Sequence, residues 1–404
     1  MVTKTKQPET QKIPKLRFPG FFGAWENFRI QELIDRKIII GHLDGNHGGL
    51  YPRQDEFSLE GVPYIAANDF ISGKVVFDSC KRLPIDRAKK FRKGVAKDGD
   101  VLFAHNATVG PSAVLKTQND FVILSTTATY FRCDLERLNN FFLNSYLQSI
   151  MFVGQYRKVM SQSTRNQVPI TTQRKFFIHL PNIKEQQKIA EFLKLVDEWV
   201  ENLRAQKESF EAYKKGIMQK IFSQEIRFKD DKGNNFPKWE EKRLGDIADV
   251  YQPQTISQTD LTREGYDVYG ANGIIGKYSK FNHEHEQIAI TCRGSTCGMV
   301  NFTKPNSWIT GNAMVINLDN SKVADKRFFY FLLGFSDLNY LVTGSGQPQI
   351  TGDIKKHKII MPTLKEQQNV AKFLTSIDKI IESKQQQITQ AEQWKKGLMQ
   401  QLFV

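Results

Sequence analysis

Two stretches of the chain place apolar residues at alternating steps of three and four, with polar residues between them. This spacing is typical of the seam of a coiled coil, because it returns to one face of a helix. No proline interrupts either stretch, and Pro181 and Pro362 lie just upstream, where a proline is tolerated. We therefore predict one long helix over residues 183–224 and another over 364–404. The predicted seam positions are Ile189, Leu193, Val196, Val200 and Leu203 in the first helix, and Val370, Leu374, Ile377, Ile381 and Ile388 in the second.

The two stretches are near copies of one another without a gap, offset by 181 residues (364 − 183 = 181). Lys184-Glu185-Gln186-Gln187 matches Lys365-Glu366-Gln367-Gln368, and Lys214-Lys215-Gly216 matches Lys395-Lys396-Gly397. One narrow apolar stripe cannot bury itself, whereas two copies in one chain can bury each other. We predict that the copies pack as an antiparallel coiled coil. The alternative is that each helix packs only on its own globular neighbour, as many amphipathic helices do.

Each helical stretch follows a block of short apolar runs bounded by Gly, Asn and Asp, which is typical of β-strands. The runs include VLFA and FVIL in the first block, and IAIT and MVIN in the second. Asn272-Gly273, flanked by apolar pairs, predicts a hairpin turn. Residues 138–159 and 325–341 carry helical patterns. The blocks at 15–182 and 225–363 are therefore predicted to be α+β domains, and residues 1–14 a disordered tail.

The two blocks also resemble each other, although less closely than the helices do. Each opens on an Arg-Phe pair followed by Trp-Glu, at Arg17 and Trp25 in the first block and at Arg227 and Trp239 in the second. DVLFAHNATVG (100–110) aligns with QIAITCRGSTCG (287–298), and STRNQVPIT (163–171) with GSGQPQIT (344–351). The predicted fold class is thus α+β, with two similar globular domains joined by two long antiparallel helices and a pseudo-two-fold internal repeat.

The charge of the chain points to a polyanionic partner. The 404 residues carry a net charge of +14, of which residues 184–223 hold +1 and residues 364–404 hold +2, so +11 lies elsewhere. Nucleic acid is the usual partner of such an excess. The apolar runs are too short to span a bilayer, no signal peptide opens the chain, and four cysteines make no disulfide framework. We therefore expect a cytoplasmic protein without membrane contact.

No catalytic motif is evident in the sequence. There is no Asn-Pro-Pro or Asp-Pro-Pro run of the kind that holds an extruded adenine, and GANGIIGKY (270–278) lacks the glycine spacing of a phosphate loop. His283, His285, Cys292 and Cys297 suggest zinc, but their spacing fits no standard finger. A turn histidine pair and two strand cysteines are the simpler interpretation. We predict no metal site and no catalytic residue in this chain, so catalysis would belong to partner chains.

The ordered, duplicated motifs resemble the specificity subunit of type I restriction-modification systems, the HsdS family. The resemblance rests on the repeated Lys-Glu-Gln-Gln helices ending in Lys-Lys-Gly-Ile/Leu-Met-Gln, the Arg-Phe and Trp-Glu pairs, GANGIIG, and the Gln-Ile-Thr-like segment before each helix. It covers the chain from about Lys15 to Val404.

The resemblance implies two target recognition domains, each reading one half of a bipartite sequence in double-stranded DNA, with a helix pair that sets the gap. It implies two methyltransferase subunits and two restriction (endonuclease and translocase) subunits as partners. These would methylate adenine at N6 and restrict unmodified DNA. S-adenosylmethionine, ATP and Mg would be bound by the partner subunits, and this chain would bind no cofactor.

Candidate DNA-binding residues lie in polar loops at matching places in the two blocks, because Arg, Asn, Gln, Ser and Thr read base edges. For each of them the alternative is a polar residue that only caps a loop. Lys89, Lys90, Arg92 and Lys93 form a basic cluster that either contacts phosphates or is only a solvated face. The candidates are His105, Asn106, Thr108, Ser163, Thr164, Arg165 and Gln167 in the first block, and Tyr269, Asn272, Arg293, Ser295, Thr296, Gln347 and Gln349 in the second.

Three other functions stay open at the level of sequence. The chain could be a stand-alone bipartite DNA-binding protein, a coiled-coil scaffold without a restriction-modification partner, or an enzyme with catalysis of its own. The near-neutral helices with their repeated ends favour protein contacts, and the excess charge in the blocks disfavours a pure scaffold.

Overall fold

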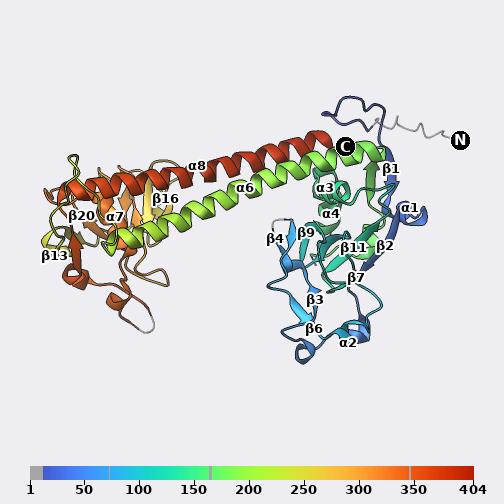
Figure 1. Ribbon diagram of the computed structural model, residues 1–404, viewed down its shortest axis with the longest axis horizontal. Coiled ribbons are helices and arrows are strands. Elements are labelled where there is room, and N and C mark those ends of the chain that lie inside the picture. The colour runs from blue at the N-terminus through green and yellow to red at the C-terminus, as the bar shows by residue number, and fades with distance from the viewer. Residues whose placement is uncertain (1–11, 72, 163–165, 345–346) are drawn as a thin grey trace. The chain divides into compact units, whose positions relative to one another are not determined.

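The structure is a computed structural model that describes residues 12–71, 73–162, 166–344 and 347–404 (Figure 1). It divides into two compact units. Unit 1 runs to Asn202 and also includes Ile388–Val404, whereas unit 2 is Leu203–Gln387. Helix α6 (Ile183–Phe222) and helix α8 (Leu364–Leu402) each contribute to both units. Most of the predicted tail, residues 1–11, lies outside the described residues.

Unit 1 is built on two four-stranded sheets, whose strand orders are β2-β11-β8-β9 and β6-β3-β10-β7, together with the pairs β1-β12 and β4-β5. All of these pairings are antiparallel except that of β3 with β10, which is parallel. The strands are β1 (Glu26–Arg29), β2 (Ile39–Asp44), β3 (Val62–Ile65), β4 (Phe70–Ile71), β5 (Lys74–Val75), β6 (Lys81–Leu83), β7 (Val95–Ala96), β8 (Val101–Asn106), β9 (Thr108–Val114), β10 (Val122–Leu124), β11 (Ala128–Cys133) and β12 (Phe177–Leu180). The helices other than α6 and α8 are α1 (Ile30–Asp35), α2 (Ile85–Ala88), α3 (Asn140–Gln148), α4 (Ile150–Met160) and α5 (Ile170–Gln173), with short 3₁₀ turns η1 (Gly48–Leu50), η2 (Gln54–Glu56) and η3 (Ala67–Asp69).

Unit 2 repeats this topology in a shorter form. Its four-stranded sheet has the order β14-β20-β17-β18, its three-stranded sheet the order β16-β15-β19 with β15 and β19 parallel, and β13 pairs with β21. The strands are β13 (Glu240–Arg243), β14 (Asp249–Tyr251), β15 (Tyr266–Gly270), β16 (Gly273–Tyr278), β17 (Ile288–Thr291), β18 (Val300–Phe302), β19 (Trp308–Ile309), β20 (Ala313–Asn317) and β21 (Lys358–Met361). Beside them lie α7 (Lys326–Phe335) and the 3₁₀ turns η4 (Leu244–Asp246), η5 (Gln258–Asp260), η6 (Asn339–Leu341) and η7 (Gly352–Lys356).

The predicted hairpin agrees with the structure, and the two helices predicted within the blocks differ from it in extent. The hairpin predicted at Asn272-Gly273 is confirmed, since β15 and β16 pair antiparallel and Gly273 takes the positive φ of 90° that the turn requires. The helix predicted over 138–159 is instead two helices. They break at Ser149, whose hydroxyl caps α4 by accepting a hydrogen bond from Phe152 N. The helix predicted over 325–341 ends at Phe335.

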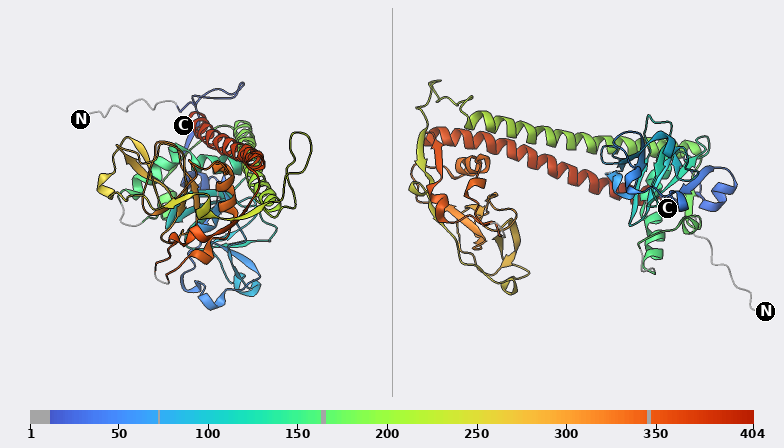
Figure 2. Two further views of the ribbon diagram at one scale, coloured as in Figure 1. Left: turned by 90° about the vertical axis from the view of Figure 1, so that its left-hand side faces the viewer. Right: turned by 90° about the horizontal axis from the view of Figure 1, so that it is seen from below.

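Within each unit α6 and α8 lie side by side (Figures 1 and 2). In unit 1 Lys395 Nζ pairs with Asp197, and in unit 2 Lys214 Nζ lies 2.6 Å from Asp378 Oδ1. These two ion pairs are the same contact in the two copies, because both lysines and both aspartates are related by the 181-residue offset. All of the predicted seam residues are buried except Ile381, which is half-buried against the core of unit 2.

The repeated Glu-Gln motif fastens each helix start to its own unit. Glu185 accepts two hydrogen bonds from the Arg17 guanidinium, at 2.8 and 2.7 Å, and Glu366 accepts two from Arg227, at 3.1 and 2.6 Å. Gln186 Oε1 accepts a hydrogen bond from the backbone N of Asn139, the N-cap of α3. Gln367 does the same for Asp325, the N-cap of α7. The motif therefore links the Arg-Phe segment, the long helix and the domain helix in each unit.

The phenylalanine at the end of each copy closes a hydrophobic core. Phe403 packs on Trp25, Phe142 and Tyr146, with ring centroids 5.6–6.2 Å apart. Its counterpart Phe222 packs on Phe328 at 5.9 Å in unit 2. Helix α8 thus ends at the core of unit 1, and α6 ends at the core of unit 2. In both copies the aromatic residue at the helix end packs against that core.

Candidate nucleic-acid interface

The structure brings two of the predicted segments of unit 1 together at the end of β8. His105 is buried, Asn106 and Gln167 are half-buried, and Thr108 is exposed. The backbones of Asn106 and Gln167 form an isolated antiparallel bridge, so the β8–β9 turn and the segment before α5 lie in contact. Ser163, Thr164 and Arg165 lie outside the described residues.

Unit 2 brings its own two candidate segments together in the same manner. Arg293 and Gln349 form an isolated antiparallel bridge, and both side chains are exposed. Ser295 and Gln347 are exposed beside them in sequence, and Thr296 is half-buried. These residues belong to the β17–β18 loop and to the segment that precedes η7.

The other two candidates of unit 2 lie on the β15–β16 hairpin. Asn272 is exposed at its turn, and the neighbouring Ala271 accepts a hydrogen bond from the Thr291 hydroxyl at the end of β17. The turn therefore borders the Arg293 loop. Tyr269 is instead buried in a small apolar cluster, and its hydroxyl accepts a hydrogen bond from Lys304 N at 3.1 Å.

A buried polar network supports the candidate segments of unit 1, and sequence reasoning missed it. Gln173 Nε2 donates to Val168 O at 2.9 Å and to Thr129 Oγ1 at 3.1 Å. Its Oε1 lies 3.2 Å from His42 Nε2. Arg174 Nε donates to the other ring nitrogen of His42, at 3.4 Å. His42 Nε2 therefore carries the proton and donates a hydrogen bond to Gln173 Oε1. A fully buried glutamine has no distinguishing pattern in the sequence, so only the fold identifies this role.

Burial sets the protonation state of this network. It lowers the pKa of His42 to about 3; Arg174 and His105 add to that effect, and the hydrogen bond with Gln173 opposes it. Burial also lowers the pKa of His105, whose two ring nitrogens lack a hydrogen-bond partner among the described residues. Both rings are therefore neutral at pH 7.

The folded chain is expected to lose stability as the pH falls below 6.5. The unfolded chain protonates His42 near pH 6.5, whereas the folded chain does so only near pH 3, so the unfolded state binds more protons between these values. His42 alone should lower the unfolding free energy by about 2 kcal/mol between pH 7 and pH 5. Urea unfolding at both pH values measures the total loss, to which His47, His105, His179, His283 and His357 also contribute because burial lowers the pKa of each. The part of the loss that His42→Gln removes is the contribution of His42. The exposed Gln118 of the same unit provides the control, since its side chain does not titrate and Gln118→Asn should leave the pH dependence unchanged. An equal pH dependence in wild type and His42→Gln would contradict the assignment.

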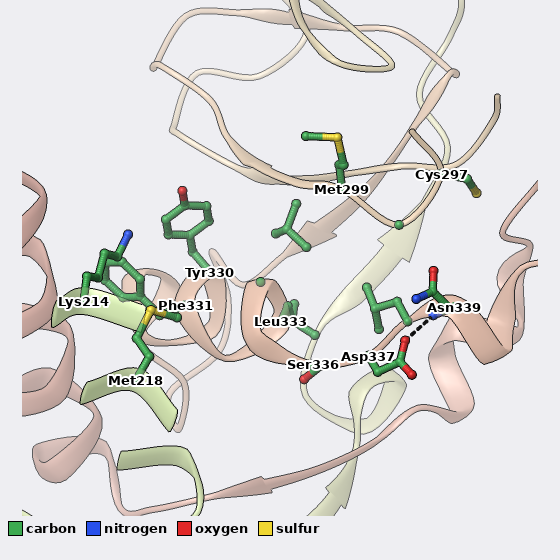
Figure 3. A pocket seen from close by; sticks show the side chains of 14 residues that line it. Lys214, Met218, Cys297, Met299, Tyr330, Phe331, Leu333, Ser336, Asp337 and Asn339 are labelled. Atoms are coloured by element: carbon green, nitrogen blue, oxygen red, sulfur yellow. Dashed lines mark hydrogen bonds between the residues drawn. The ribbon is translucent and has the colours of Figure 1, made fainter. Parts of the chain in front are cut away.

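A cavity of about 520 Å³ adjoins the Arg293 loop within unit 2 (Figure 3). Met299 from the loop, Tyr330 from α7 and Met218 from α6 line it. The polar side chain on its α6 side is already engaged, because Lys214 pairs with Asp378 and lies 5.1 Å from the centroid of the Phe331 ring. The loop that carries the candidate residues therefore borders the long helix.

The residues of the zinc alternative take part in ordinary contacts. His283 Nε2 lies 2.9 Å from Tyr251 Oη, and Gln252 Nε2 lies 3.0 Å from the buried Cys292 Sγ. Across the described ranges, no three His, Cys, Asp or Glu side chains gather so as to hold a metal ion. None of the helices in those ranges combines the length and apolarity of a membrane span.

The chain holds two units of one α+β fold, and each presents polar side chains where the same two segments meet. Together with the positive net charge, this arrangement is typical of a protein that reads a two-part nucleic-acid sequence. The comparisons with known proteins agree. The family described as the type I restriction modification DNA specificity domain matches residues 23–212 and 237–393. The chain belongs to this family.

Two curated relatives cover most of the chain. A provisionally named MjaX specificity subunit of a type I restriction enzyme from Methanocaldococcus jannaschii is 26% identical, over 94% of this chain and 93% of its own length. The EcoprrI type I restriction enzyme specificity subunit of Escherichia coli is 23% identical, over 81% and 83%.

Two solved structures share the fold at 17% identity. The type I restriction-modification S subunit from M. genitalium has a TM-score of 0.56 and covers 97% of this chain and 99% of its own. A chain from a study of complex assembly and conformational transition of the type I system has a TM-score of 0.57, with coverages of 94% and 97%.

Proposed function

We propose that this chain is the DNA-specificity subunit of a type I restriction-modification complex and is itself non-catalytic. Each globular domain reads one half of a bipartite target in double-stranded DNA. The observation that carries the proposal is the family match across both units, which have corresponding strand arrangements, shorter in unit 2. The charge of +11 outside the helices supports contact with phosphates, to which the exposed Lys89, Lys90, Arg92 and Lys93 contribute.

The helix pair is proposed to act as an antiparallel coiled coil that sets the gap between the half-sites. The repeated Asp–Lys ion pairs and the buried seam support this part of the proposal. Equal contacts in the two copies also support a pseudo-two-fold arrangement, which would match the dyad of duplex DNA. Two methyltransferase subunits dock on the near-neutral helices, and two restriction subunits join them.

The chemistry is proposed to reside in the partner subunits, which work in the cytoplasm. They bind S-adenosylmethionine, ATP and Mg, methylate one adenine at N6 on each strand, and restrict DNA that lacks the mark. This chain contributes recognition, so its substitutions should change which sequence is modified rather than how the methyl group is transferred.

A single-molecule methylome of cells that carry this chain with a matching methyltransferase subunit tests the proposal. We expect a split motif with N6-methyladenine on both strands, and loss of that motif when this chain is deleted. Co-purification of the two chains is the accompanying control. Absence of methylation from a complex that assembles would contradict the proposal and favour a stand-alone DNA-binding protein.

A further inference from the structure

Three backbone contacts join the end of β8 to the segment before α5 in unit 1. They are Ala107 N to Asn166 O at 3.0 Å, Val168 N to His105 O at 2.7 Å, and the antiparallel bridge of Asn106 with Gln167.

The same three contacts recur in unit 2 with different residues. They are Gly294 N to Pro348 O at 3.0 Å, Ile350 N to Cys292 O at 3.0 Å, and the antiparallel bridge of Arg293 with Gln349. Asn106 and Arg293 are therefore equivalent positions, as are Gln167 and Gln349.

The residues that follow Asn106 and Arg293 confirm this equivalence independently. Ala107 has a φ of 63° and Gly294 a φ of 87°, so both take the left-handed conformation. A non-glycine residue seldom adopts this conformation, and it makes a sharp corner in the chain. Each unit thus presents one polar side chain, Asn106 or Arg293, directly before the same backbone corner, with a glutamine bridged to it from the second segment.

These side chains keep hydrogen-bonding capacity for a ligand. Within the described part of the chain, the side chains of Gln167, Arg293 and Gln349 have no hydrogen-bond or ion-pair partner. Asn106 uses its Oδ1 to accept from Ala107 N at 2.9 Å, which leaves its Nδ2 as a donor. Polar groups held on a rigid bridge without a protein partner are suited to reading base edges.

We propose that Asn106 with Gln167, and Arg293 with Gln349, are the equivalent base-reading pairs of the two half-sites; this rests on the proposed function. Arg293 reads a guanine through its O6 and N7, because the guanidinium fork fits that edge. Gln167 and Gln349 each read an adenine through N6 and N7. Asn106 Oδ1 is already engaged with Ala107 N, so we assign its free Nδ2 as the reading group, which donates to an acceptor on a neighbouring base. The two half-sites are consequently expected to differ most at the base that Asn106 reads in the first half-site and Arg293 reads in the second.

The test uses the assembled complex with its methyltransferase subunit and duplexes carrying single base changes in each half-site. Arg293→Ala should lower discrimination at one guanine of the second half-site by about 5- to 150-fold and leave the first half-site unchanged. Arg243→Ala, which removes an exposed arginine from β13 of the same unit, is the matched control and should retain the wild-type motif.

A change of specificity gives a stricter test than a loss. Gln167→Glu should move the preference at one position of the first half-site from adenine to cytosine, because a carboxylate accepts from the cytosine amino group. Gln118→Glu adds the same charge at an exposed site of unit 1 and should change no base preference.

The outcomes separate this inference from the proposed function. A wild-type complex that methylates a split motif, with an Arg293→Ala variant that keeps full discrimination, overturns the inference alone. An equal loss of binding at all sequences, with a smaller salt dependence, identifies a phosphate contact and also overturns it. A wild-type complex without a split motif overturns both.

Discussion

Replacing Glu185 by alanine is expected to lower the unfolding free energy by about 3 kcal/mol. The Glu185 side chain is 1% exposed and accepts both hydrogen bonds of the Arg17 fork, with Trp25 Nε1 a further 3.4 Å donor. The substitution leaves the Arg17 guanidinium, only 14% exposed, without its counter-ion. The remaining bonds of Arg17 to backbone carbonyls do not neutralise its charge. Urea unfolding of the wild type and the variant measures the loss.

A surface pair provides the control for this prediction. Glu241 and Lys358 also pair across 2.8 Å, but they are 57% and 68% exposed, so water replaces the contact when it is removed. Glu241→Ala should therefore change stability by less than about 1 kcal/mol. Hydrogen exchange can locate the effect of Glu185→Ala, which should appear first around Arg17 and the start of α6. Equal losses in the two variants would show that the buried pair has no special role.

The long helices could be predicted from sequence because their signal is repeated and narrow. A seam with alternating steps of three and four admits one helix face, and the second copy fixes its limits independently. The hairpin at Asn272-Gly273 could also be predicted, because an Asn-Gly pair between apolar residues favours a tight turn in which the glycine takes a positive φ. The break at Ser149 could not be predicted, because the sequence on both sides of it is helical and the serine acts through its cap.

The candidate site was predictable as two segments but not as residue pairs. When the segments 100–110 and 287–298 are aligned at their final glycines, Gly110 and Gly298, Thr108 matches Thr296, an offset of 188 residues. The bridges instead match Asn106 with Arg293, an offset of 187. The two loops differ by one residue between these points, and polar loop sequences contain nothing that marks where a residue is added. Backbone pairing and the left-handed corner do mark it.

The burial of individual polar side chains could not be predicted from the sequence either. His105 and Tyr269 are candidate readers by residue type, yet the structure places both side chains inside their units. A histidine at the end of an apolar strand and a tyrosine on a hairpin can face either side of the sheet, and one residue of register decides which. Gln173, in turn, matters because it is buried, and its hydrogen-bond partners His42, Thr129 and Val168 come from three different places in the chain.

Removing one heptad from both long helices is expected to shorten the preferred gap between the half-sites by about three base pairs. Deleting Leu203–Ser209 from α6 and Lys384–Gln390 from α8 takes seven residues from each helix, and a rise of about 1.5 Å per residue makes each shorter by ~10 Å. This length corresponds to about three steps of 3.4 Å along DNA. Both deletions lie between the two Asp–Lys ion pairs, so each pair can still form in register. The seam is also kept, because a heptad is its repeat.

The expected affinity is lower than that of the wild type, since the helices shorten almost without rotation while three base-pair steps rotate the second half-site by roughly 100°. Selection from duplexes with fixed half-sites and variable gaps, using the assembled complex, measures the preferred gap directly and does not require methylation. Deleting Leu203–Ser209 alone should instead destabilise the chain, because Asp197–Lys395 and Lys214–Asp378 could no longer form together. A double deletion that assembles and keeps the wild-type gap would rule out the helix pair as the spacer. The gap would then have to be set by the domains or by the partner subunits.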